Sequence, residues 1–324
     1  MSRRFALIVP TVLLLTAFGE GGSRRQPHAQ GGAWAPIPSM PTARSGAAAV
    51  VVGETLYVIG GQHLKSFLDA NEAFDTRTQR WTRKAGLGLG RTFTAPSATV
   101  INGSIYVVAG NPRGYCTNRA EVYDVRRDRW RTLAAAPRAR CHAAVVGLGT
   151  RLYVMGGWNT SSTVRYTDVD VYDVAAGRWT PGVPLPGWRG AMAAAAIDQT
   201  IYLVGGTTAD ATLSTSVIAL DAKSGRWVPK APIPTPRGAP ATAVRDGRLY
   251  VIGGFMLPAG EPVLSRIVES YDPRTNTWRE EPSLPEPRAY AAAAAVNDRV
   301  YVIGGVKTTD DTGILSSGVA LSGR

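Results

Sequence analysis

A short segment that ends in two glycines recurs six times and constrains the fold more than any other feature of the chain. In each copy a Tyr stands between aliphatic residues, three residues before the first Gly, which is Ala109 in the second copy. Neighbouring tyrosines are 47 to 51 residues apart; they are Tyr57, Tyr106, Tyr153, Tyr202, Tyr250 and Tyr301. Repeats of this length are supersecondary units that bury their apolar faces against one another. We therefore expect six copies of one structural unit.

Three further series keep the same phase as the tyrosines. The first is a Trp, the second an Asp six residues before it, and the third an Arg ten residues after it. The tryptophans are Trp34, Trp81, Trp130, Trp179, Trp227 and Trp278; the Asp series starts at Asp75 and has five members. The arginines are Arg44, Arg91, Arg140, Arg189, Arg237 and Arg288.

Each unit reads as four short strands. The Arg is followed by a run of small apolar residues, as in 47–52, which favours a strand packed on both faces. Pairs such as Asn102-Gly103 tolerate the positive φ of a tight hairpin. The second strand ends at the double glycine, where a backbone bends or lies close to a neighbour. A variable loop then leads to a third strand, and the Asp begins a turn into the fourth, which carries the Trp.

The double glycine, the Tyr before it and the spaced Trp together resemble the kelch repeat, over about residues 33–321. The resemblance implies an all-β, six-bladed β-propeller with one four-stranded blade per repeat. Trp34 has no Tyr-Gly-Gly segment before it, and the segment of Tyr301 has no Trp after it. We therefore expect the Trp34 strand to pair into the last blade, so that residues 33–324 form one closed domain.

The N-terminus predicts export. Arg3 and Arg4 precede an uncharged apolar run of 14 residues, Phe5 to Phe18, which is shorter than the roughly 20 residues of a spanning helix. This pattern predicts a secretory signal peptide over 1–19 and a flexible spacer over 20–32. The expected location is the bacterial periplasm or the extracellular space; the alternative is an uncleaved N-terminal anchor.

One face of the predicted propeller carries the long, variable loops 62–70, 111–119, 158–168, 207–216, 255–267 and 306–318. Binding residues commonly lie on loops held by a rigid scaffold. The six arginines begin the inner strands on this face, and Arg pairs bidentately with carboxylate or phosphate. The alternative is that each Arg satisfies backbone carbonyls. The predicted ligand-binding residues are these six arginines with Trp158, Trp188, Phe93 and Tyr290.

The two cysteines fall on the same face in adjacent blades. Cys116 lies in the loop of the second repeat, and Cys141 follows the Arg that opens the third. A disulfide suits an exported protein, and two free thiols are the alternative. The second repeat is also irregular, with two extra residues near Thr92 and Phe93 that predict a bulge.

The charge balance sets the partner that we expect. Lys and Arg number 36 against 24 Asp and Glu, a net charge of +12. Basic residues are dispersed among the turns, as at Arg126, Arg127, Arg129 and Arg131, which disfavours nucleic acid. We expect a monomeric, non-catalytic binding module for an acidic glycan or an acidic protein segment.

Two enzyme classes are the alternatives to a binding module. One is a sugar epimerase or mutarotase, similar to exported kelch proteins that act on sialic acids. The other is a copper oxidase, but His63 and His142 are about two repeats apart and form no ligand-spaced cluster. No cofactor or metal is predicted.

Overall fold

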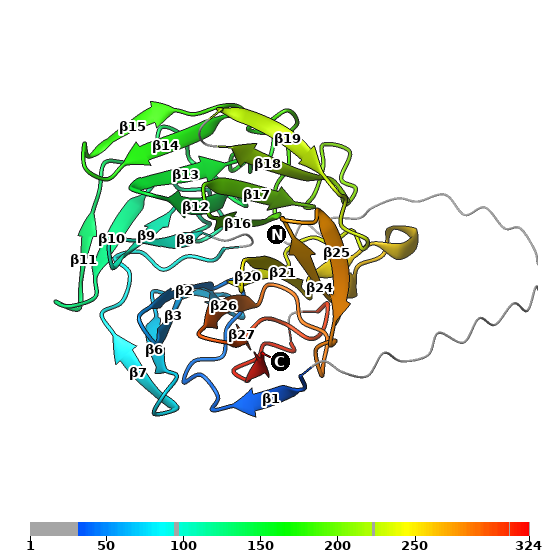
Figure 1. Ribbon diagram of the computed structural model, residues 1–324. Helices are drawn as coiled ribbons and strands as arrows, with labels where there is room; N and C mark the ends of the chain where they lie inside the picture. The colour runs from blue at the N-terminus through cyan, green and yellow to red at the C-terminus, as the bar shows by residue number, and fades with distance from the viewer. Residues whose placement is uncertain (1–31, 94–96, 222–223, 311, 324) are drawn as a thin grey trace, which may run out of the picture. The chain divides into compact units, whose positions relative to one another are not determined.

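The computed structural model describes residues 32–93, 97–221, 224–310 and 312–323. Within them, six antiparallel sheets of four strands each stand like blades around a central axis (Figure 1). The predicted all-β, six-bladed propeller is confirmed. The predicted signal peptide 1–19 and nearly all of the spacer 20–32 lie outside the described residues. No helix among the described residues is long and apolar enough to cross a membrane.

The blades follow one another along the chain, each from its inner to its outer strand. Blade 1 holds β2 (Ala48–Val52), β3 (Thr55–Ile59), β6 (Asn71–Asp75) and β7 (Arg80–Lys84). Blade 2 holds β8 (Ala98–Ile101), β9 (Ser104–Val108), β10 (Ala120–Asp124) and β11 (Arg129–Thr132). Blade 3 holds β12 (Ala144–Leu148), β13 (Arg151–Met155), β14 (Val169–Asp173) and β15 (Arg178–Pro181).

The other three blades repeat this order. Blade 4 holds β16 (Ala193–Ile197), β17 (Thr200–Val204), β18 (Val217–Asp221) and β19 (Arg226–Lys230). Blade 5 holds β20 (Ala241–Arg245), β21 (Arg248–Ile252), β24 (Val268–Asp272) and β25 (Thr277–Glu281). Blade 6 holds β26 (Ala292–Val296), β27 (Arg299–Ile303), β28 (Gly318–Ser322) and β1 (Trp34–Ile37). The variable loops add the hairpins β4 (Gln62–His63) with β5 (Ser66–Phe67) and β22 (Phe255–Met256) with β23 (Val263–Leu264), and the 3-10 helix Pro258–Gly260.

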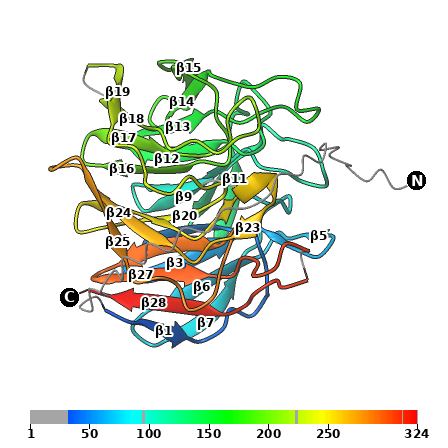
Figure 2. The same cartoon turned by 90° about the vertical axis from the view of Figure 1, so that its right-hand side faces the viewer.

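The ring is closed within blade 6. Strand β1 is antiparallel to β28, with Trp34 opposite Leu321 (Figure 2). The two ends of the domain therefore share one sheet. The six inner strands are neighbours around the axis, and their alanines and valines line most of a central cavity of about 300 Å³. Small side chains are needed here because six strands converge on one axis.

Each outer-strand Trp joins its blade to the preceding one. Its indole Nε1–H donates to a carbonyl beyond the preceding outer strand, which satisfies the one polar group of a large apolar side chain. The acceptors are Pro282 O for Trp34 (2.7 Å), Pro38 O for Trp81 (2.8 Å), Ala85 O for Trp130 (2.7 Å), Ala134 O for Trp179 (2.9 Å), Val183 O for Trp227 (3.2 Å) and Ala231 O for Trp278 (2.8 Å).

The double glycines place backbone against backbone between blades. The second Gly of each pair donates its N–H to the carbonyl of the Arg that opens the next blade. These bonds are Gly61 to Arg91 (2.8 Å), Gly110 to Arg140 (3.1 Å), Gly157 to Arg189 (3.0 Å), Gly206 to Arg237 (3.3 Å), Gly254 to Arg288 (2.7 Å) and Gly305 to Arg44 (3.0 Å). A Cβ on Gly156, the first of its pair, would lie 2.4 Å from the Arg189 carbonyl oxygen. A side chain at Gly156 would therefore press the two blades apart, whereas the second repeat accommodates Ala109 at the matching position.

Two glycine substitutions test this contact. Gly156 and Gly53 both have left-handed backbones, with φ of 66° and 61°, but a Cβ on Gly53 would meet nothing within 4 Å. We expect Gly53→Ala to cost about 1 kcal/mol of unfolding free energy, for the left-handed backbone alone. Gly156→Ala should cost about 2 kcal/mol more, because the blades must move apart. Urea unfolding measures both, and equal losses would contradict the contact.

Candidate functional site

The six repeat arginines lie on the loop face, but their side chains are inside the fold. Arg189 is 8% exposed and the other five are at most 1% exposed. In blade 3, for example, the Arg140 guanidinium donates to the carbonyls of Gly156 (2.8 Å) and Asp168 (3.1 Å). Their burial corrects the expectation that these arginines present their guanidinium groups to a carboxylate or phosphate ligand, and it agrees with the alternative that each Arg satisfies backbone carbonyls.

Four of these arginines are also paired with a buried carboxylate on the third strand of their own blade. The pairs are Arg44 with Glu72 (2.8 Å), Arg91 with Glu121 (2.6 Å), Arg140 with Asp170 (2.7 Å) and Arg237 with Glu269. Burial lowers the pKa of Arg140, and the charge of Asp170 opposes that shift. The sequence reasoning missed these acids, although each stands three residues before the Asp of the repeat. Their position was the signal that could have found them.

In blades 4 and 6 the buried repeat Arg has other partners, because the third strand has no acid at this position. The third-strand position holds Ile218 in blade 4 and Val319 in blade 6. Arg189 donates instead to the hydroxyl (2.6 Å) and carbonyl (3.2 Å) oxygens of Ser216. Arg288 pairs with Glu286 at 2.8 Å. Arg189 is thus the one repeat Arg with no carboxylate partner among the described residues.

A polar pocket of about 230 Å³ lies on the loop face beside the central cavity, and Tyr290 lines both. Repeated backbone bridges build the polar pocket, because the residue after each Arg pairs with the residue after each double glycine. Ser45 pairs with Gln62 in this way, and Thr92 pairs with Asn111. The described lining is Ser45, Gly46, Gln62, Thr92, Asn111, His142 and Tyr290. Hydroxyl, amide, imidazole and phenol groups therefore meet here from blades 1, 2, 3 and 6.

An aromatic row begins at the wall of this pocket. The His142 ring is stacked on Trp158, with centroids 3.9 Å apart and planes at 19°. Trp188 follows at 5.7 Å from Trp158, and the Arg165 guanidinium carbon lies 4.9 Å from the centroid of Trp188. Both tryptophans are partly exposed and Arg165 is exposed. The row thus leads from a polar pocket to a solvent-facing cation.

His142 is uncharged at neutral pH. Burial lowers the pKa of its imidazole to about 4. An uncharged imidazole offers one donor and one acceptor nitrogen. From the sequence, His142 is a candidate only as a metal ligand, because nothing local predicts its stacking on a Trp from the next loop. Within the described residues, no group of three His, Cys, Asp or Glu side chains could hold a metal ion.

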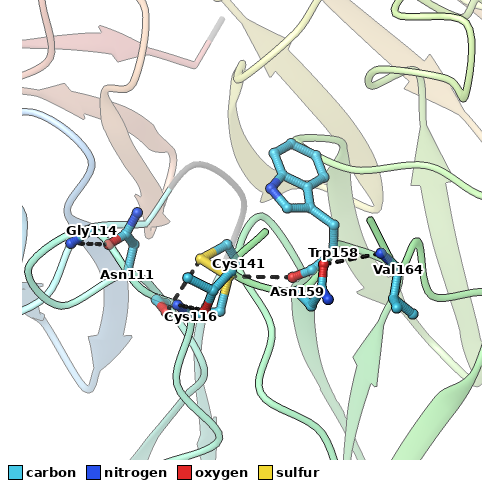
Figure 3. Close-up of a disulfide and its surroundings, with 9 residues drawn as sticks. Asn111, Gly114, Cys116, Cys141, Trp158, Asn159 and Val164 are labelled. Carbon is cyan, nitrogen blue, oxygen red and sulfur yellow. Dashed lines mark hydrogen bonds between the residues drawn. A yellow bond between two sulfur atoms is a disulfide. The ribbon is translucent and has the colours of Figure 1, made fainter. Parts of the chain in front are cut away.

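A disulfide between Cys116 and Cys141 holds this part of the site together (Figure 3). It joins the loop of blade 2 that carries Asn111 to the strand entrance of blade 3 that carries His142. Cys141 and Trp158 exchange two backbone hydrogen bonds, of 2.9 and 3.1 Å. In Figure 3 the Trp158 indole points away from the disulfide. The cross-link therefore fixes two pocket walls and the first Trp of the row.

The remaining predicted site residues have different surroundings. Tyr290 lines the pocket, and its ring is 6.2 Å from that of Phe255. Phe93 is 3% exposed and packs in the core between blades 1 and 2, which corrects its assignment to an exposed aromatic surface. The bulge predicted near Thr92 and Phe93 borders residues 94–96, which lie outside the described residues.

Comparison with known proteins agrees with this architecture. The family model of the KLHDC2/KLHL20/DRC7 kelch-repeats domain matches residues 34–184 and 180–305. An F-box/kelch-repeat protein of Arabidopsis thaliana is 41% identical over 54 residues, which are 17% of this chain and 16% of that protein. Alpha-scruin of Limulus polyphemus is 39% identical over 54 residues, 17% of this chain and 6% of that protein. These matches span a small part of either relative.

Among solved structures, that of YjhT superposes on 89% of this chain and 97% of its own, with a TM-score of 0.76 and 17% sequence identity. At that identity the likeness concerns the fold alone.

Replacing two repeat arginines, one with a carboxylate partner and one without, compares what each contributes to stability. Arg237→Ala leaves buried Glu269 without its one salt-bridge partner among the described residues, which we expect to cost about 3 kcal/mol or more of unfolding free energy. Arg189→Ala strands no carboxylate and should cost about 1 to 2 kcal/mol. Urea unfolding of the two variants gives the comparison, and a larger loss for Arg189→Ala would overturn it.

The low pKa of His142 also makes a pH prediction. As pH falls, the unfolded chain, with an ordinary His pKa near 6.5, takes up the proton before the folded one, whose pKa is about 4. This contribution to stability is therefore complete above about pH 6.5 and lost as pH falls toward about 4. Between about pH 7 and pH 4.5, His142→Asn should lose about 2 kcal/mol less than the wild type. A loss of stability that is the same at both pH values cancels in this comparison. Urea unfolding at each pH measures the two profiles, and identical profiles for the variant and the wild type would refute the lowered pKa of His142.

Proposed function

The chain belongs to the kelch-repeat family, and on this premise we propose that it binds an acidic glycan at the polar pocket and aromatic row of its loop face. A kelch propeller is a binding or interaction module whose rigid ring holds variable loops. The observation that carries the proposal is the composition of the pocket wall. Sugar binding fits that wall better than the other ligands considered.

The pocket wall matches the hydroxyl groups of a sugar. Ser45 and Thr92 supply hydroxyls, while Gln62 and Asn111 supply amides that both donate and accept. Each sugar hydroxyl can likewise donate and accept. Uncharged His142 adds a polar imidazole to the wall without drawing in a counter-ion. A few convergent polar groups of this kind fix the orientation of a small ligand.

The aromatic row extends the pocket in the way that a glycan longer than one sugar requires. Trp158 and Trp188 are partly exposed; His142 covers one face of Trp158 and Arg165 lies over Trp188, so a sugar ring would contact the ring surface that these two side chains leave open. Arg165 at the end of the row is exposed and in no salt bridge among the described residues, and it donates one hydrogen bond, to Ala209 O. Its guanidinium would pair with the carboxylate of an acidic sugar.

Two alternatives use parts of the same surface. An acidic protein segment would place a carboxylate at Arg165 and an apolar side chain on Trp188, but it would leave the hydroxyl and amide wall without matched partners. A sugar epimerase would need a side chain that moves a proton. His142 is a weak base for this role because its pKa is about 4.

We also propose that the protein works outside the reducing cytosol. The disulfide between Cys116 and Cys141 supports this location, because disulfides persist mainly in oxidising compartments. It agrees with the signal peptide expected at residues 1–19.

Calorimetric titration with a methyl glucuronoside and a methyl glucoside tests the glycan proposal, after a glycan array has ranked larger ligands. Trp158→Ala should weaken binding of both glycosides about tenfold, since it removes the flat surface beside the pocket. Arg165→Gln should weaken only the glucuronoside. Tyr115→Ala is the matched control, because Tyr115 is exposed on the same face but does not line the pocket. Unchanged affinities in the Trp158 variant would reject the site.

A further inference from the structure

The outer strands of blades 1 and 2 form a continuous stretch of the propeller rim. Trp130 on β11 donates its Nε1–H to Ala85 O at 2.7 Å, just beyond the end of β7. Asp128, in the turn before β11, accepts a bond of 2.7 Å from the Ala85 N–H. Figure 1 shows β7 and β11 following one another around the outside of the ring.

In contrast to the dispersal among turns expected from the sequence, exposed arginines gather on this stretch, which we name the basic rim. Its members are Arg80, Arg83, Arg126, Arg127, Arg129 and Arg131, all exposed. Arg127 pairs with Asp124 at 2.7 Å, and Arg83 lies 4.0 Å from Glu72. The other four take part in no salt bridge within the described part of the chain. The nearby acid Asp128 is already engaged by the Tyr123 hydroxyl and by the Ala85 N–H. The basic rim therefore carries net positive charge toward solvent.

The repeat itself does not require three of these arginines, Arg126, Arg127 and Arg131, whereas an Arg stands at the position of Arg129 in blades 1 to 4. Blade 3 has Ala175 and Ala176 where blade 2 has Arg126 and Arg127, and it has Thr180 where blade 2 has Arg131. Those alanines still close their turn, because Asp173 accepts both of their backbone N–H groups, at 3.0 and 2.9 Å. A blade thus folds without positive charge at these three positions, so the charge is available to interact with another molecule.

Strand β11 is also the free edge of its sheet, since the strand order of blade 2 is β11-β10-β9-β8. An edge strand presents unpaired backbone N–H and C=O groups to an incoming strand. Arg129 and Arg131 share one face of β11, while Trp130 turns to the other and packs 5.0 Å from Tyr123. Side chains two apart on a strand are separated by about 6.7 Å, the same spacing as alternate side chains of an extended peptide.

We propose that the basic rim binds an extended acidic segment of another protein, which adds as a strand to the free edge of β11. Carboxylates at alternate positions of the segment lie opposite Arg129 and Arg131, as in cross-strand pairs of opposite charge. A single line of arginines along a strand edge suits one extended chain better than a flat lipid surface. This site is independent of the loop-face pocket.

The test uses a fluorescein-labelled peptide of alternating Thr and Glu, with a Thr-Gln peptide as its neutral match. The double variant Arg129→Gln, Arg131→Gln should weaken binding of the Thr-Glu peptide about tenfold. The double variant Arg178→Gln, Arg226→Gln is the matched control, because these exposed arginines precede the Trp of blades 3 and 4. The control should change affinity less than about twofold. Equal losses in both variants, or no binding to the wild type, would overturn the proposal.

Two further measurements separate strand addition from other kinds of attraction. Bound peptide should slow hydrogen exchange of the β11 amides, and binding without that protection would overturn strand addition. The double variant Arg129→Glu, Arg131→Glu reverses the charge of β11. It should bind a Thr-Lys peptide and lose binding to the Thr-Glu peptide. Binding of the Thr-Lys peptide would also show that the variant strand is folded. Binding of the wild type to phosphatidylglycerol vesicles but not to the Thr-Glu peptide would favour a membrane and reject the segment. Glycoside binding at the loop face should be the same in all rim variants.

Discussion

The hydrogen bond from each second glycine to the next blade's Arg carbonyl is the contact on which the rest of the structure depends. It occurs six times, at 2.7 to 3.3 Å, and it joins main chain to main chain. At four of the five first glycines a Cβ would lie within 2.6 Å of the next Arg carbonyl oxygen, so the closeness of the blades favours glycine there, and only the second repeat has Ala109 instead. The loops that form the polar pocket begin directly after the double glycines. Their positions are therefore set by the same contact that holds the ring together.

The spacing of the repeats predicted much of this fold, because each series marks one strand or turn. The role of the arginines could not be predicted in the same way. Arg140 and Asp170 are thirty residues apart in the chain, and only the folding of a blade brings them together. The same limit applies to the pocket, where His142 and Trp158 meet across a backbone bridge between two loops. Local patterns identify strands, whereas the pairing of side chains across strands decides which groups face solvent.

The distribution of charge changes how the net charge of +12 should be understood. Five of the six repeat arginines are paired with a carboxylate, so their charges are largely balanced within the blades. The unbalanced positive charge lies instead on the exposed outer strands, most densely on blades 1 and 2. The polar pocket of the loop face, in contrast, is lined by uncharged hydroxyl, amide, imidazole and phenol groups. One propeller thus presents two chemically distinct surfaces.

Closure of the ring through β1 and β28 has a consequence for how the protein folds. Trp34 and Leu321 are opposite one another but 287 residues apart in the chain (321 − 34). Contacts between such distant residues form late and slow the search for the native state. Blades 1 to 5 can each assemble from residues that are close in sequence. Blade 6 is complete only when the strands from both ends of the domain have paired. The seam of the ring is therefore the last part to form, and it is where an incompletely folded molecule would offer an open sheet edge to its neighbours.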